Sequence, residues 1–186
     1  MPFARPKKRD PVGEAELFDY AVGTLARRMR TVRDLRRLMK PRAHEGEQGE
    51  RDMDRVVERL TELKYLSDTR FAQDFTRLRK ENQGFGRRRV QQDLALKGVD
   101  KELAQTTLAA AYDEADEVAL ARAYCERKRI KPPEGPEAQK HTVRLMNRLM
   151  RAGYSSTAIF KLLRAWRVET PEEDPAEPSG HDLPEF

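Results

Sequence analysis

The sequence predicts an all-α protein, a tandem repeat of three three-helix modules forming an elongated, curved rod. One observation is composition: 37% of the 186 residues are charged and 38% hydrophobic, which fills several small cores more readily than one large core. A second is that apolar residues recur at helical spacing through the middle of the chain. A third is a weak repeat, in which Leu35, Leu94 and Leu149 lie 59 and 55 residues apart. Such units stack only on their neighbours, which produces a rod.

Composition and periodicity divide the chain into five segments. The N-terminal segment is basic and contains prolines, and the C-terminal segment is rich in Pro, Glu and Asp with little to bury. The expected segments are a basic flexible arm at residues 1–13, module 1 at 14–66, module 2 at 67–112, module 3 at 113–168 and an acidic disordered tail at 169–186.

Module 1 contains three helical stretches. The first starts at Glu14 with one apolar stripe, and Thr31 has the character of an N-cap for a short second helix. Residues 41–50 are expected to form a flexible loop, because a proline and two glycines lie there. The third helix ends near Tyr65.

Module 2 repeats this pattern with clearer boundary signals. Ser67 or Asp68 is expected to cap its first helix, and the two glycines within residues 84–86 break that helix. Gly98 ends the second helix in a left-handed conformation, and Asp100 caps the third.

Module 3 has the same organisation. Its second helix is expected to bury four apolar side chains, Val143, Met146, Leu149 and Met150. Gly153 ends that helix and Ser156 is expected to cap the last one. Trp166 is interpreted as a core residue of the last helix rather than as a platform for stacking bases.

The charge is distributed unevenly along the chain. Lys and Arg total 37 and Asp and Glu total 32, a net charge of +5. Residues 171–186 hold six of the acids and no Lys or Arg, so the rest carries 37 basic against 26 acidic residues, +11. A positive body attracts polyanions or acidic protein surfaces. The alternative is that these charges only solvate the helices.

Several function classes are disfavoured by the sequence. Cys125 is the single cysteine, so no internal disulfide can form, and a reducing, cytoplasmic location is expected. No signal peptide and no apolar run of about 20 residues is present, so no membrane association is expected. Metal-ligand spacings, a P-loop and a nucleophile elbow are also missing. We therefore expect no enzyme, no catalytic residue, no metal and no cofactor.

The most informative segment follows Gly84. Arg87, Arg88 and Arg89 would occupy the first turn of a helix, whose partial positive charge makes three guanidiniums there unfavourable by a few tenths of a kcal/mol each. An anionic partner would offset this repulsion and accept forked hydrogen bonds. Alternatively, the three side chains extend into water. Phe85 is either a partner contact or a core residue.

Cations on the flanking helices would enlarge this basic area. The candidate partner- or DNA-binding residues are Arg70, Arg77, Arg79, Phe85, Arg87, Arg88, Arg89 and Lys97. Further basic clusters recur in modules 1 and 3, and the cluster in module 3 includes Arg144, Arg148 and Arg151.

The middle of the chain resembles the central signature of RecX regulatory proteins. The matching residues, in order, are Tyr65-Leu66-Ser67-Asp68, Phe71-Ala72, Gly84-Phe85-Gly86, Arg89-Val90, Asp93-Leu94 and Lys97-Gly98. The three rounds of helices also agree with the tandem three-helix modules of that family. Two departures stand out, because Ser67 replaces an acid and Arg87 stands where the family has a helix-starting proline.

The resemblance implies a monomeric modulator of the RecA recombinase, acting in DNA repair, DNA recombination and the SOS response. RecX proteins are thought to lie in the groove of the RecA filament on single-stranded DNA. There they impede ATP hydrolysis, strand exchange and filament growth, and inhibition is the usual outcome. Many weak contacts along a rod would combine into useful avidity.

Two other readings remain open from the residues alone. The chain could be an autonomous helical DNA-binding protein that acts through phosphate contacts, because three-helix units with a glycine between the second and third helices resemble helix-turn-helix modules. It could also be a plain helical scaffold. The sequence leaves open whether the effect on the recombinase is inhibition or support, which module dominates binding, and whether the acidic tail competes for the basic body.

Overall fold

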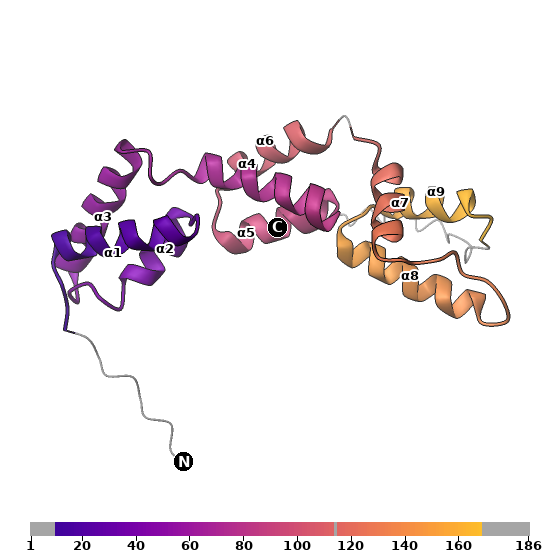
Figure 1. The fold of residues 1–186 in the computed structure, drawn as a ribbon, viewed down its shortest axis with the longest axis horizontal. Helices are drawn as coiled ribbons and strands as arrows, with labels where there is room; N and C mark the ends of the chain where they lie inside the picture. The colour runs from indigo at the N-terminus through magenta and orange to yellow at the C-terminus, as the bar shows by residue number, and fades with distance from the viewer. Residues whose placement is uncertain (1–9, 114, 169–186) are drawn as a thin grey trace, which may run out of the picture.

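A computed structural model describes residues 10–113 and 115–168 of the protein. Within these residues it contains nine α-helices and one π-helical turn, arranged as an elongated rod (Figure 1). The predicted fold class, an all-α rod of helical repeats, is thereby confirmed. The acidic tail and most of the basic arm lie outside the described residues.

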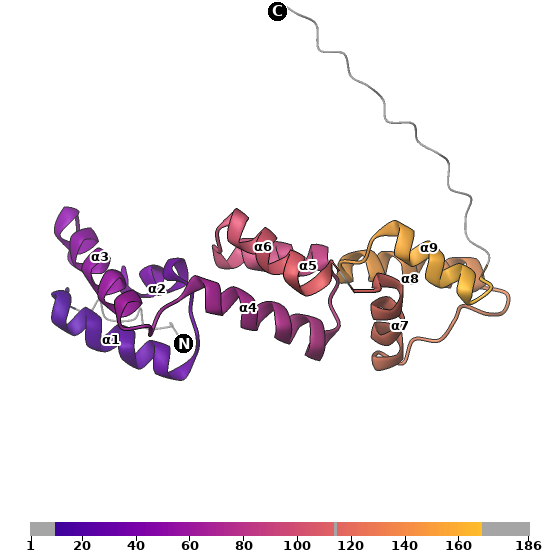
Figure 2. The ribbon, with the colours of Figure 1, turned by 90° about the horizontal axis from the view of Figure 1, so that it is seen from above.

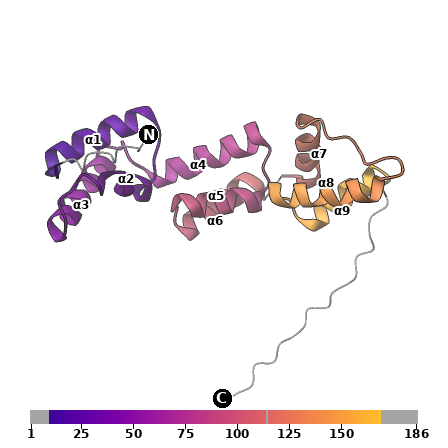
Figure 3. The same ribbon diagram turned by 90° about the horizontal axis from the view of Figure 1, so that it is seen from below.

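The helices form three consecutive bundles of three. The first bundle contains α1 (Glu14–Arg27), α2 (Val32–Met39) and α3 (Glu47–Glu62). The second contains α4 (Asp68–Leu78), the π-helical turn Arg79–Gln83, α5 (Arg87–Lys97) and α6 (Lys101–Tyr112). The third contains α7 (Glu117–Arg127), α8 (Ala138–Ala152) and α9 (Ser156–Ala165). Figures 2 and 3 show the bundles following one another along the long axis, with α4 lying beside α5 and α6.

Each bundle buries its own apolar stripe. The first core includes Leu17, Leu35 and Leu60, the second Phe71, Leu94 and Leu108, and the third Leu145, Leu149 and Leu162. Short helices of this kind are marginal alone, so packing of the three stripes stabilises each bundle. Phe85 and Leu120 are half-buried and pack against both the second and third cores. These two bundles therefore share apolar contacts.

The first and second bundles meet through polar groups. The Thr31 hydroxyl donates to the Lys97 carbonyl at 2.7 Å, and the Val32 amide donates to the Asp68 carboxylate at 2.9 Å. The Lys97 ammonium lies 3.4 Å from the Asp34 carboxylate. Burial raises the pKa of Asp68, although the bond from Val32 opposes the shift.

Three of the predicted helix caps and two of the predicted glycine helix ends are confirmed. The side chains of Thr31, Ser67 and Asp100 accept hydrogen bonds from backbone amides of the helices that follow them. Gly98 and Gly153 end α5 and α8 with φ of 77° and 95°, a conformation that favours glycine.

The predicted cap of α9 is wrong by one residue. The cap is Ser155, whose hydroxyl accepts from the Ala158 amide at 3.2 Å. The Glu117 carboxylate accepts from the Ser155 amide and hydroxyl at 2.7 and 2.6 Å. This contact with α7 holds Ser155 outside the helix and leaves Ser156 as its first residue.

The predicted loop over residues 41–50 is too long. α3 already begins at Glu47, and Gly49 is buried in its first turn. A Cβ on Gly49 would lie 1.8 Å from the His44 carbonyl oxygen. Gly49, which was predicted to lie in the loop, is therefore required by the close packing of α3 against the His44 backbone.

The buried face of α8 also differs from the prediction. Val143 and Met150 are 45% and 47% exposed. Leu149 is buried as predicted, and the other buried residues of this helix are Thr142, Leu145 and Ala152. Thr142 can be buried because its hydroxyl donates to the Ala138 carbonyl at 2.9 Å, which turns Val143 and Met150 towards solvent.

Candidate nucleic-acid interface

The second and third bundles meet where the start of α5 touches the end of α8. The Gly86 amide donates to the Ala152 carbonyl at 2.8 Å, and the Arg88 amide donates to the Gly153 carbonyl at 3.3 Å. A Cβ on Gly86 would lie 2.4 Å from the Gly153 oxygen. Only glycine allows this approach, which fixes α5 beside α8.

Two tyrosine hydroxyls reinforce this junction. The Tyr154 hydroxyl lies 2.5 Å from the Gly84 carbonyl and 3.0 Å from the Leu120 carbonyl, and the Tyr112 hydroxyl donates to the Phe85 carbonyl at 2.7 Å. Burial raises the pKa of Tyr112 to about 12 and also raises that of Tyr154. Both phenols therefore stay protonated and neutral at physiological pH.

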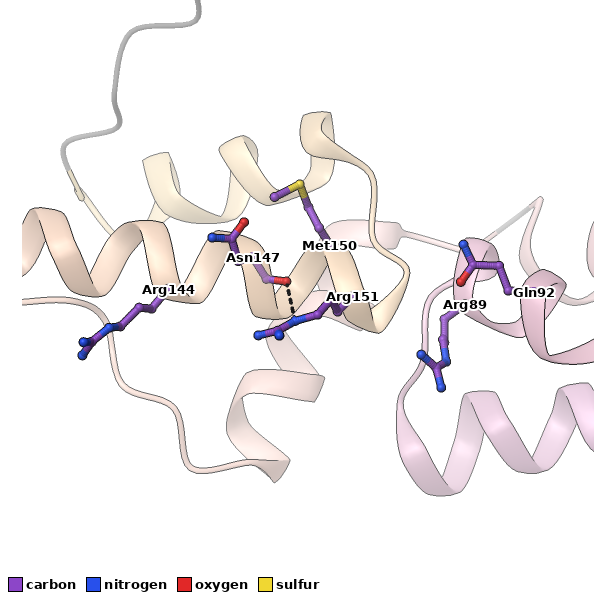
Figure 4. Close-up of a pocket in the computed structure, with 6 residues that line it drawn as sticks. All are labelled: Arg89, Gln92, Arg144, Asn147, Met150 and Arg151. Carbon is purple, nitrogen blue, oxygen red and sulfur yellow. Dashed lines mark hydrogen bonds between the residues drawn. The ribbon is translucent and has the colours of Figure 1, made fainter.

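A groove of about 630 Å³ lies across the junction (Figure 4). Its lining residues are Arg89 and Gln92 from α5 and Arg144, Asn147, Met150 and Arg151 from α8. The six include three guanidiniums, two amides and no carboxylate. We name this surface the junction groove.

The spacing of these residues aligns them along the groove. Arg144 and Arg151 are seven residues apart, so they share a face of α8 about 10 Å from each other along its axis. Arg89 and Gln92 are three apart on α5 and are neighbours in the same way. Figure 4 shows the three guanidinium groups following one another on one side of the two helices.

Most of the charge in the junction groove is not neutralised by the described residues. Arg144 makes no ion pair or side-chain hydrogen bond there, and Arg151 donates only to the carbonyl of Asn147, at 3.3 Å. Arg89 lies 3.2 Å from the Asp93 carboxylate. An anion entering the groove would meet donors that can form charge-assisted, forked hydrogen bonds.

Three of the predicted site residues form one cluster beside the groove. The guanidiniums of Arg79 and Arg89 each lie 5.6 Å from the centroid of the Phe85 ring. Asp93 pairs with Arg79 at 3.3 Å and with Arg89 at 3.2 Å. In this arrangement the ion pair with Asp93 neutralises the charge of Arg79, and the contacts with Asp93 and Phe85 orient Arg89 towards the groove.

Two other predicted residues are paired within the protein. Arg87 forms an ion pair with Asp113. Arg77 lies 3.3 Å from Asp74 and 3.5 Å from Glu81. All three pairs are exposed, so they are weak, but they reduce the net charge that these arginines offer to a partner.

The predicted basic area is not continuous. Arg88 is exposed at the start of α5 with no ion pair among the described residues, whereas Lys97 is at the other end of that helix, about 15 Å away along its axis. Arg70 lies beside Lys64 and Tyr65 in a separate recess next to the first bundle. Lys97 and Arg87–Arg89 thus lie at opposite ends of an eleven-residue helix, and a basic area that includes both stays a prediction.

Of the six residues that line the junction groove, only Arg89 was predicted as a site residue. Arg144 and Arg151 were grouped with a separate cluster in module 3, and Met150 was expected in the core. The exposed spacing of Arg144, Asn147 and Arg151 on one helix face was the available signal. Their position beside Arg89 depends on the contact between Gly86 and Gly153, which no local pattern contains.

Among residues 10–113 and 115–168, no group of three or more His, Cys, Asp or Glu side chains could hold a metal ion. None of the helices in this part of the chain is both long and apolar enough to cross a bilayer.

The sequence and the fold of this chain resemble those of known proteins. Residues 67–108 match the family model described as RecX, second three-helix domain. The chain is 29% identical over 166 residues to the regulatory protein RecX of Mycobacterium ulcerans, an alignment that covers 88% of this chain and 91% of that protein. The chain is thus similar to RecX proteins over most of its length, and the second bundle is the part that matches their family model.

Other RecX proteins extend this relationship. The regulatory protein RecX of Halalkalibacterium halodurans is 28% identical over 159 residues, covering 84% of this chain and 57% of that protein. The crystal structure of RecX from Lactobacillus salivarius has the same fold, with a TM-score of 0.62 at 18% identity, covering 84% of this chain and 97% of that one. These relatives are named as regulatory proteins and not as enzymes. The family match includes Arg89 and Gln92 of the junction groove, while its α8 residues lie outside that match.

Proposed function

We propose that this protein is a RecX-type regulator that binds the RecA–single-stranded DNA filament, in the filament groove, and modulates RecA without chemistry of its own. ATP hydrolysis, strand exchange and filament growth are the affected steps, and inhibition is the expected direction. The match of residues 67–108 to a RecX domain, the similarity to RecX proteins and the elongated shape support this proposal. A rod can touch several subunits of a helical filament at once, and linked weak contacts give avidity.

The observation that carries the proposal is the junction groove. Its three guanidiniums face a recess without a carboxylate, which suits the phosphates of a DNA strand held in the filament. The lining amides can add neutral hydrogen bonds but present no helix face for reading base edges. Contact with DNA is therefore expected to be independent of sequence and steeply dependent on salt.

The proposal divides the candidate residues by role. Arg88 and Arg89, together with Arg144 and Arg151, contact the phosphates, and Arg70 offers a second contact near the first bundle. The remaining candidates act by position: Arg79 and Phe85 hold Arg89, while Arg77, Arg87 and Lys97 stabilise the rod through internal ion pairs.

We also propose that the protein is monomeric and cytoplasmic. Cys125 is fully buried in the third core, and burial raises the pKa of its thiol to about 11. Such a thiol is a small core side chain and is unsuited to form a bond with a second copy.

RecA hydrolysis of ATP on single-stranded DNA tests the proposal. Wild-type protein should lower the rate at less than one copy per RecA. The variant Arg144→Gln/Arg151→Gln should need about ten times more protein, because two phosphate contacts are lost. Lys161→Gln/Arg164→Gln, which removes the same charge from the exposed side of α9, should behave like wild type.

The outcomes separate the alternatives. No change in hydrolysis at any ratio contradicts the proposed function. Equal behaviour of the two double variants would mean that the junction groove is not the contact. Tight binding to DNA alone, without any effect on hydrolysis, would favour the autonomous DNA-binding protein.

A further inference from the structure

The junction groove has a chemical complement within the same chain. Residues 169–186 contain seven acids and no Lys or Arg. The acids are Glu169, Glu172, Glu173, Asp174, Glu177, Asp182 and Glu185. The groove has the opposite composition, three arginines and no carboxylate.

We infer that the acidic segment 169–186 binds in the junction groove of its own chain and competes there with the anionic partner. The identity of the displaced partner, a phosphate backbone, rests on the proposed function. The intramolecular contact itself rests only on the groove and on the sequence of the segment. The segment then acts as an intramolecular competitor. A polyanion occupies the junction groove only if its affinity is high enough to displace the segment.

The geometry of the third bundle brings the segment within reach. The described chain ends at Val168, which is half-buried against the third core directly after α9. α9 packs against α8, the helix that supplies Arg144 and Arg151. α8 is about 22 Å long, whereas eighteen residues can span up to about 60 Å. The whole length of the groove is therefore accessible from Val168.

The free charge in the third bundle selects the groove over other basic surfaces. In the first bundle Arg36 and Arg55 already pair with acids of their own bundle. Lys161 and Arg164 on α9 are also exposed, but they line neither the junction groove nor the neighbouring recess around Lys131. In the groove, guanidiniums from two helices line one space, so a carboxylate there can accept charge-assisted hydrogen bonds from more than one of them.

Tethering determines what the contact does. A linked segment has an effective concentration in the millimolar range, so even a weak carboxylate contact is well populated. A short oligonucleotide must displace it with few phosphates, whereas a long strand or filament replaces it with many contacts at once. The acidic segment would thus reduce binding to isolated short strands more than binding to an extended polymer.

A full-length variant with its acids neutralised tests this inference. In this tail-amide variant, all seven Asp and Glu of residues 169–185 become Asn and Gln. Fluorescence anisotropy should show about tenfold tighter binding to a short labelled single strand at about 50 mM salt, and most of the gain should vanish at about 300 mM. The net charge rises from +5 to +12, so a general electrostatic effect must be separated from a specific one.

A double-mutant cycle makes that separation. Neutralising the acids should still tighten DNA binding in the Lys161→Gln/Arg164→Gln background, but by less than about twofold in the Arg144→Gln/Arg151→Gln background. The two backgrounds carry the same charge. An equal gain in both would overturn the inference, because the acids would then act only through net charge.

A second measurement needs neither DNA nor RecA. A labelled synthetic peptide of residues 169–186 should bind the tail-amide variant, and Arg144→Gln/Arg151→Gln should weaken this binding about tenfold more than Lys161→Gln/Arg164→Gln does. Peptide binding that ignores the groove arginines, or no binding, refutes the inference. Groove-dependent peptide binding without any effect on RecA would leave the inference standing and refute the proposed function. Inhibition of RecA without groove-dependent peptide binding would refute the inference and leave the proposed function standing.

Discussion

Replacing Gly86 by alanine should separate the second and third bundles without straining the backbone. Gly86 has φ of −74° and ψ of 165°, which alanine adopts freely. The added Cβ would lie 2.4 and 2.6 Å from the Gly153 carbonyl oxygen and carbon and 2.9 Å from the Tyr154 nitrogen. All three atoms are backbone, so α5 and α8 must move apart by about 1 Å to restore a van der Waals contact near 3.5 Å.

That movement sets the magnitude of the effect. It lengthens the bond from the Gly86 amide to Ala152, now 2.8 Å, and the bond from the Arg88 amide to Gly153, now 3.3 Å, beyond hydrogen-bonding distance. Each lost bond costs about 1 kcal/mol. Weaker packing of the half-buried Phe85 adds to this, so the free energy of unfolding should fall by about 2–4 kcal/mol.

Gly13 provides a matched control. It is also an N-cap glycine, with φ of −80°, and the nearest atom to an added Cβ is 3.7 Å away. Gly13→Ala carries the same loss of cap preference, below about 1 kcal/mol, with no clash. Urea unfolding, followed by circular dichroism and by the fluorescence of Trp166, the only tryptophan, gives both values. The junction also orients the groove, so only Gly86→Ala should weaken binding to single-stranded DNA.

Equal losses of stability in the two glycine variants would refute this reasoning. It would mean that the bundles can separate by 1 Å at no cost, and that the close approach at Gly86 does not hold the junction groove together. Normal DNA binding by a destabilised Gly86→Ala variant would also refute the link between the junction and the groove, while leaving the steric argument intact.

Three more outcomes follow from buried groups. Thr31→Val removes a fully buried hydroxyl that caps α2 and bonds the last turn of α5, so urea unfolding should show a loss of about 1–2 kcal/mol. Burial raises the pKa of Tyr112 from 10.0 to about 12, so between these values the folded chain keeps a proton that the unfolded chain releases. Stability should therefore be full below pH 10.0 and fall as pH rises towards about 12, with a smaller fall in Tyr112→Phe, as measured by urea midpoints. Cys125 is 0% exposed and its thiol pKa is raised to about 11, so a thiol reagent at about pH 8 should label it no faster than the protein unfolds, as mass spectrometry can follow.

Helix boundaries could be predicted from the sequence because they depend on neighbouring residues. The buried faces of the helices could not all be predicted, because they depend on tertiary packing. Thr31 and Asp100 bond to amides two or three residues ahead, so their role needs nothing beyond the neighbouring chain. The buried face of α8 was misassigned because a polar residue, Thr142, takes a core position. Its hydroxyl bonds back within the helix, and no hydropathy pattern reveals that compensation.

The ion pairs of the three consecutive arginines also differ in whether the sequence predicts them. The pair between Arg89 and Asp93 is four residues apart on one helix and could have been read from the sequence. Arg87 instead pairs with Asp113, twenty-six residues away, through the packing of α6. Arg87, Arg88 and Arg89 are consecutive in the sequence, but each guanidinium has different surroundings.

The two junctions of the rod differ in kind, and this difference bears on how it could fit a filament. Between the first and second bundles, the described contacts are mainly hydrogen bonds and an ion pair, such as that between Lys97 and Asp34. Water can replace such bonds at small net cost. Between the second and third bundles, Phe85 and Leu120 are shared by both cores and two glycines lock the backbones together. Separation there exposes apolar surface as well. The junction groove spans the second kind of junction, so its arginines keep their spacing while the first bundle can tilt to follow the surface that it meets.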